Sequence, residues 1–263
     1  MTLAHADGWS VWSLVTVAAA GYLLLADRRR RDPRSWNAWR SAAFVAGCAL
    51  VGVALTPQLL PFPDGDLRAH MLQHLLIGMV APLGLVLAAP MTLVLRSVDP
   101  RHGRRIVRAL RCRPVHLLAN PVTALSLNVG GLVLLYCTPL YVATTGNAAL
   151  HDAVHLHVLA AGCLFTWVIA GPDPAPRRPS VPARLVVLGV AIAVHASLAQ
   201  LLYAGLYVQV PASADELRGA AALMYYGGDV AELLLAFALV TTWRPRRTAP
   251  PANRAARMAR STG

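Results

Sequence analysis

The sequence has little charge for its length and no lysine at all. Only 14% of its 263 residues are charged and 56% are hydrophobic, whereas a typical soluble domain has about 25% charged residues. Several uninterrupted apolar runs reach the roughly 20 residues that a helix needs to cross a bilayer. These features exclude a soluble globular domain and a disordered chain. They indicate a polytopic integral membrane protein.

Cysteine and the common catalytic motifs are scarce as well. The four cysteines, Cys48, Cys112, Cys137 and Cys163, include no CxxC pair, so neither a disulfide framework nor a zinc finger is predicted. The chain contains no HExxH, GxSxG or P-loop motif. A zincin-type protease is therefore not supported, nor are the activities that depend on the other two motifs. We expect a protein that is not an enzyme.

Hydropathy predicts an all-α fold of seven transmembrane helices. Prolines follow the second, third, fifth and seventh apolar runs and support their ends. The seven runs form one transmembrane domain over residues 1–243, and a basic cytoplasmic tail, 244–263, is expected to be disordered. The predicted spans are Trp9–Ala26, Ser41–Leu60, Ala69–Leu95, Leu117–Val142, Leu150–Ala170, Arg184–Val208 and Gly219–Trp243.

Arginine carries all the basic charge and predicts the orientation. The net charge is +12, and of the 24 arginines all but Arg68 and Arg218 lie in the first, third or fifth gap between spans, or in the tail. Short arginine-rich loops stay cytoplasmic, which predicts an outside N-terminus and a cytoplasmic C-terminus. The third gap, Arg96–His116, is expected to hold a basic amphipathic helix on the inner leaflet. We therefore expect the arginines to face anionic lipid headgroups, and we predict no nucleic-acid partner.

Ionisable residues inside a membrane are costly and mark candidate functional sites. His70 and His74 lie at the outer end of the third span, and His151 and His155 lie at the outer start of the fifth. Residues four apart share one face of a helix, and helical metal sites use this spacing. His157 is predicted to point to nearly the opposite side. Hydrogen-bonded interfacial histidines without a metal are the alternative.

Further polar residues lie deeper in the predicted bundle. His195 of the sixth span and Asp229 of the seventh have similar depth and are expected to pair if their helices are neighbours, with Glu232 one turn deeper. These three residues form either a structural hydrogen-bond network or a proton relay. Met224, in the outer third of the seventh span, offers a thioether. Imidazole suits copper, zinc, iron and nickel, and a nearby thioether favours Cu(I).

Three motifs carry a resemblance to a known family. They are His70-Met71-Leu72-Gln73-His74 followed by Ala81-Pro82-Leu83, His151-Asp152-Ala153-Val154-His155 followed by Phe165-Thr166-Trp167, and the Leu223-Met224 step. In this order and at these helix ends, they resemble the motifs of the multi-span CtaG family of bacterial cytochrome c oxidase assembly factors. The resemblance extends from about residue 40 to residue 243.

The resemblance implies a multi-pass protein of the bacterial plasma membrane that helps a haem–copper oxidase to mature, with copper insertion as its task. His70, His74, His151 and His155 then become the expected metal-site residues, and Met224 an additional soft ligand for Cu(I). The implied partners are the oxidase subunits and an extracytoplasmic copper chaperone.

Three alternatives stay open at this point. The same histidine pairs suit a haem-binding membrane protein, because histidines on facing helices can ligate haem iron. His195, Asp229 and Glu232 suit a proton-coupled transporter. A scaffold that holds oxidase subunits together without binding metal is the third alternative.

Overall fold

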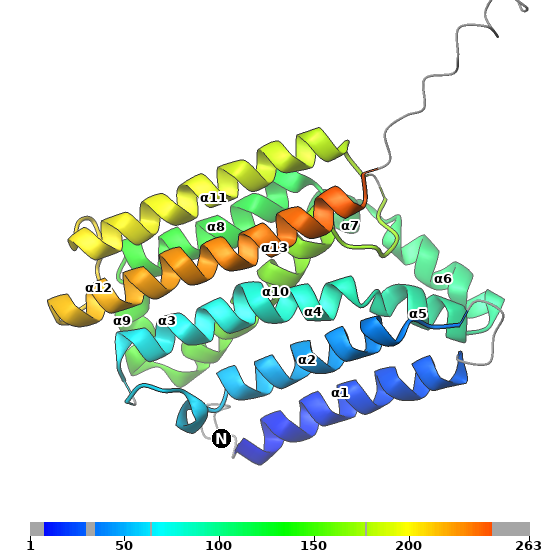
Figure 1. The fold of residues 1–263 in the computed structure, drawn as a ribbon, viewed down its shortest axis with the longest axis horizontal. Helices are drawn as coiled ribbons and strands as arrows, with labels where there is room; N and C mark the ends of the chain where they lie inside the picture. Colours follow the sequence, from blue (N-terminus) through cyan, green and yellow to red (C-terminus); the bar gives the residue numbers. More distant parts are fainter. Residues whose placement is uncertain (1–7, 30–34, 64, 177, 244–263) are drawn as a thin grey trace, which may run out of the picture.

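The computed structural model describes residues 8–29, 35–63, 65–176 and 178–243, and these residues form helices and loops without strands. Figure 1 shows long helices lying side by side, with α1 at one edge next to α2 and with α11 at the opposite edge. The predicted basic tail, 244–263, lies outside the described residues.

The helices follow one another with short connections. In chain order they are α1 (Gly8–Arg28), α2 (Ala38–Ala54), the 3₁₀ turn η2 (Pro57–Leu59), α3 (Leu67–Leu75), the π-helical η3 (Leu76–Val80), α4 (Ala81–Leu87), α5 (Pro90–Ser97), α6 (Pro100–Leu110), α7 (Arg113–Leu118), α8 (Pro121–Cys137), α9 (Leu140–Gly146), α10 (Ala148–Ile169), α11 (Val181–Ala204), α12 (Ala214–Ala222), the π-helical η4 (Leu223–Gly227) and α13 (Gly228–Thr241).

Several of these helices are suited to a membrane. In the described part of the chain, five continuous helical segments are long and apolar enough to span it, and α8 with α9 makes a sixth if this pair, bent by 76°, counts as one span. The helix α2 is apolar but has only 17 residues. The all-α membrane fold is therefore confirmed. The predicted count of seven spans is one more than these segments give, and it needs α2 to cross as well.

The break between α8 and α9 has a local cause. Thr138 adopts an extended backbone and ends α8. Pro139 is the next residue, and a proline disfavours helical backbone in the residue before it. The predicted fourth span, 117–142, is thus not one straight helix. Its last turn becomes α9, which leads directly into α10.

Side-chain caps set the first turns of the two helices that carry the histidine pairs. Asp66 precedes α3 and accepts a hydrogen bond from the backbone N–H of Arg68 at 2.7 Å, while the Arg68 guanidinium contacts its carboxylate at 2.6 Å. The Arg68 guanidinium holds the pKa of the Asp66 carboxyl below its usual value. Asn147 caps α10 by accepting a hydrogen bond from the Leu150 N–H at 3.1 Å. Each cap fixes the residue at which its helix begins.

Glycines bring the third-span segment against α10. A Cβ on Gly162 would collide with the backbone of Gly78, and a Cβ on Gly78 would touch the Val158 side chain at 2.8 Å. Small residues allow this close approach of two membrane helices. Gly78 lies one turn beyond His74, and Gly162 lies two turns beyond His155. The glycine contact therefore holds the two histidine pairs at the same level.

Two π-helical segments interrupt the spans near this contact. The first, η3, ends two residues before Pro82. Pro82 cannot donate a backbone hydrogen bond to Gly78 and would clash with the Gly78 carbonyl in a regular α-helix. The wider turn relieves that clash. The second, η4, is followed by Gly228. Segments of this kind occur frequently at functional sites.

Candidate metal centre

The two predicted histidine pairs meet in the structure. One ring nitrogen each of His70, His74 and His155 lies within 4.8 Å of the others. His151 extends the group, with its ring centroid 4.3 Å from that of His155 and 6.0 Å from that of His70. Two helices that are far apart in sequence thus bring four imidazoles together. We call these four residues the outer histidine cluster.

The polar atoms of this cluster are buried without partners. The His74 side chain is only 3% exposed, and neither of its ring nitrogens has a hydrogen bond to the described residues. The Nε2 atoms of His70 and His155 are also buried and unpaired. Buried polar atoms in proteins are nearly always hydrogen-bonded or bound to a ligand. The free nitrogens therefore fit a ligand shared between α3 and α10.

The cluster has a graded exposure and an aromatic wall. His70 and His151 are half-buried, whereas His74 and His155, one turn further into the membrane-spanning segments, are buried. Tyr141 packs edge-on against the His70 ring, with 5.0 Å between ring centroids. His70 and His151 therefore form the more exposed end of the cluster, and His74 and His155 form its inner end.

The donor set suits a transition-metal ion. Three imidazole nitrogens within 4.8 Å of one another are close enough to share one ion, and imidazole binds copper, zinc, iron and nickel. The three nitrogens come from both α3 and α10, so one compact ion can be shared between the two helices.

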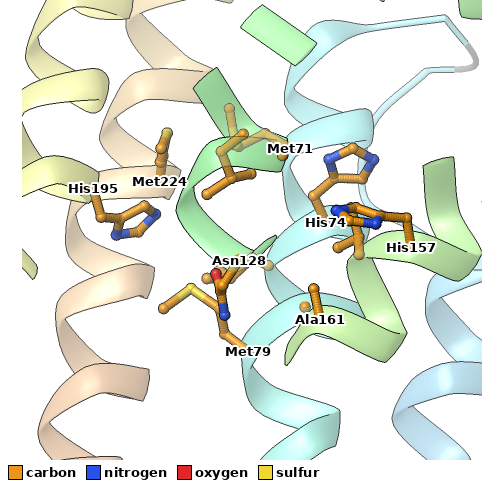
Figure 2. Close-up of a pocket in the computed structure, with 13 residues that line it drawn as sticks. Met71, His74, Met79, Asn128, His157, Ala161, His195 and Met224 are labelled. Carbon is orange, nitrogen blue, oxygen red and sulfur yellow. The ribbon is translucent and has the colours of Figure 1, made fainter. Parts of the chain in front are cut away.

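A cavity continues inward from the cluster (Figure 2). Met71, His74, Met224 and His195 all line it. Met224 is only 2% exposed and thus belongs to this cavity rather than to the half-buried mouth of the cluster. The Met71 sulfur accepts a hydrogen bond from the Tyr136 hydroxyl at 3.6 Å.

The remaining predicted residues occupy other positions. His157 makes no ring contact with the four clustered histidines: it contacts the carbonyl oxygen of Leu127 at 3.1 Å and lines the inner cavity. His195 lies beside Glu232, with 3.5 Å between Nδ1 and Oε1. Among the carboxylates of the described residues, Glu232 is the one that reaches His195, and the expected pairing with Asp229 is not formed. A turn of helix separates the two acids, so the rotation of α13 decides which one faces His195.

Several residues of the site were not predicted from the sequence. Tyr136 and Tyr141 form its aromatic wall, and Met79 and Asn128 line the inner cavity. Tyrosine and asparagine in an apolar run give a polar signal, but which residues they face depends on the packing of α8 and α9 against the other helices. Met71 and Met79 read as packing residues in the sequence, and their position around one cavity follows only from the packing of the helices.

Comparison with known proteins shows a family relationship. The family described as cytochrome c oxidase caa3 assembly factor (Caa3_CtaG) matches residues 20–246. An uncharacterized protein of Mycobacterium bovis and one of Mycobacterium tuberculosis are each 31% identical over 199 residues, and one of Mycobacterium leprae is 29% identical over 199 residues. Each match covers 72% of the present chain but only 30% of the relative. No solved structure matches.

Proposed function

The chain belongs to the cytochrome c oxidase caa3 assembly factor family, and from this premise we propose that it binds Cu(I) transiently at the outer histidine cluster and passes it to the oxidase. The observation that carries the proposal is the set of three imidazole nitrogens within 4.8 Å, together with the buried, unpaired nitrogens of His74. Copper is the transported ion in this proposal rather than a resident cofactor. The protein itself catalyses no reaction.

The residues support ligand exchange as the means of transfer. His70 and His151, at the half-buried mouth, take up the ion from an extracytoplasmic chaperone. His74 and His155 hold it in a dry environment, where neutral imidazole is the form that binds metal. The thioethers beyond His74 favour Cu(I) over harder ions. Release to an oxidase subunit needs only the exchange of one ligand for another.

The proposed topology places the cluster on the outer side of the bacterial plasma membrane. We propose that α2 is a seventh span in addition to the six candidate spans, giving an outside N-terminus and a cytoplasmic C-terminus. The arginines support this orientation because those of α6 and the neighbouring loops lie at the end of the bundle away from α3 (Figure 1). Short arginine-rich loops are retained in the cytoplasm. Copper would then be handled outside the cytoplasm.

The experiment compares oxidase maturation in cells that carry defined variants. We expect cells with His74→Ala plus His155→Ala to produce oxidase with normal haem but a reduced copper-to-haem ratio. The matched control is His102→Ala plus His116→Ala, which removes two exposed histidines of α6 and α7 and should leave the ratio unchanged. Membrane levels of each variant are measured by immunoblot.

Three outcomes would favour another function. A normal copper-to-haem ratio in the His74 and His155 variant would contradict copper delivery by this cluster. Haem absorption in the purified wild-type chain would instead support the haem-binding alternative. Loss of oxidase subunits with no change in the copper content of the remaining enzyme would support a scaffold.

A further inference from the structure

A second set of potential metal ligands lines the cavity that begins at His74. Met79 and Met224 contribute thioethers to it, and His195 contributes an imidazole at its inner end. Figure 2 shows His195 and Met224 on one side of the cavity, His74 on the opposite side, and Met79 below them. None of these three residues belongs to the outer histidine cluster.

The two methionines come from the two π-helical segments. Met79 lies in η3 and Met224 lies in η4. A π-turn changes the direction in which its side chains point, and such turns cluster at functional sites. The sulfur of the third methionine, Met71, is already engaged by Tyr136. Met79 and Met224 are therefore the thioethers that remain for an ion in the cavity.

His195 is held in place by α13 in a way that suits a metal ligand. Its ring packs directly against the backbone of α13, where a Cβ on Gly228 would collide with it. Its Nδ1 lies 3.5 Å from Glu232 Oε1. A carboxylate on one ring nitrogen of a histidine orients the ring and leaves the other nitrogen for a metal. Glu232 is only 5% exposed, and its Oε2 has no hydrogen-bond partner among the described residues.

We propose that Met79, Met224 and His195 form a second, inner Cu(I) site, with Glu232 orienting His195 and balancing the charge of the ion. This inference rests on the proposed function, since the ion reaches the inner site from His74. One imidazole and two thioethers make a soft ligand set that selects Cu(I) over zinc. The transfer exchanges ligands only, so the ion keeps its oxidation state and no electron is required. A proton held by Glu232 in the metal-free protein leaves as Cu(I) enters, which leaves the carboxylate to balance the charge.

The charge balance supports this assignment. A cation alone inside the membrane-spanning bundle would be costly, and so would an unpaired carboxylate. Glu232 and Cu(I) offset each other when both lie beside His195. Asp229, one turn away and only half-buried, forms no ion pair with His195. It acts on His195 and Glu232 at longer range through its charge.

The test is an anaerobic titration of the purified full-length chain with Cu(I) against a chromophoric competitor, combined with X-ray absorption at the copper edge. The wild type should bind two equivalents, and sulfur scattering should appear with the second. Met79→Leu plus Met224→Leu should bind one equivalent without sulfur scattering. Met91→Leu, which changes a methionine of α5 away from the cavity, should behave as the wild type.

A single acidic substitution provides a test that does not depend on the methionine variants. Glu232→Gln should weaken the second equivalent by tenfold to a hundredfold, the usual effect of losing a carboxylate behind a metal-bound histidine. Binding of the first equivalent should be unchanged. Asp229→Asn should weaken the second equivalent less than Glu232→Gln does, because Asp229 is not paired with His195.

The outcomes separate this inference from the proposed function. One equivalent in the wild type, with nitrogen scattering alone, would overturn the inner site and leave the outer cluster intact. Binding of two Cu(I) equivalents by the double methionine variant would also overturn the inner site. So would an unchanged affinity for the second equivalent in Glu232→Gln. Failure to bind any Cu(I) would contradict the proposed function and the inner site together.

Discussion

His74→Leu should have opposite effects on the stability of the metal-free and the metal-loaded protein. The two ring nitrogens of His74 are buried and have no hydrogen-bond partner in the described structure. An unpaired buried polar atom costs about 1–3 kcal/mol. Leucine has a similar size and no polar atom, so the metal-free variant should be more stable than the metal-free wild type by about 1–3 kcal/mol.

Cu(I) should reverse this order. A ligand that binds only the folded protein stabilises it by about 2.7 kcal/mol at a free concentration 100-fold above its Kd. The wild type should gain that stability when Cu(I) is added, whereas His74→Leu should gain little because it has lost a central ligand of the cluster. The two curves of stability against Cu(I) concentration are therefore expected to cross.

The assay follows unfolding in detergent by tryptophan fluorescence, with and without Cu(I) under reducing conditions. His102→Leu is the matched control, because His102 is exposed on α6 and its replacement should neither raise the metal-free stability nor reduce the gain with Cu(I). A metal-free His74→Leu protein that is less stable than the metal-free wild type would contradict the prediction that the unpaired His74 nitrogens are destabilising. It would mean that His74 is held by favourable contacts and is not poised for a ligand.

Three further predictions concern the bundle that supports the cluster. Gly162→Ala should destabilise the protein by about 1–3 kcal/mol through overpacking and should weaken Cu(I) binding. Gly189→Ala is the control for the same unfolding and binding assays, because a Cβ there meets nothing within 4 Å, and it should have neither effect. Asp173→Ala should cost about 1.5–3 kcal/mol, because its carboxylate accepts hydrogen bonds from the first turn of α5; equal unfolding curves would contradict this. Cys112 is exposed between α6 and α7 and should react with an impermeant thiol reagent only when the cytoplasmic face is accessible. Labelling of Cys112 in intact cells would show the opposite orientation.

Hydropathy predicted the helical membrane fold because a bilayer demands long apolar helices. The i, i+4 spacing also predicted which histidines share a face, and the structure brings both pairs together. That His157 lies outside the outer histidine cluster is in line with the same geometry. These features depend on periodicity within one helix, which a sequence displays directly.

Other features depend on contacts between helices and could not be predicted. The sequence does not show how α13 is rotated, and that rotation brings Glu232, not Asp229, to His195. The π-turns that bear Met79 and Met224 arise from local backbone adjustment in the packed bundle. Nothing in the sequence therefore indicated that Met79 lines a cavity, and Met224, expected as a soft ligand at the outer histidines, lines the inner cavity instead.

The copper content of the purified chain tests the central claim most directly. The full-length protein is isolated from copper-supplied cells under reducing conditions and compared with His74→Ala plus His155→Ala by elemental analysis and absorption spectroscopy. We expect copper in the wild type, loss of that copper in the variant, and no haem absorption in either. A wild-type protein that is free of copper and takes up no Cu(I) when it is supplied would contradict Cu(I) binding at the outer histidine cluster.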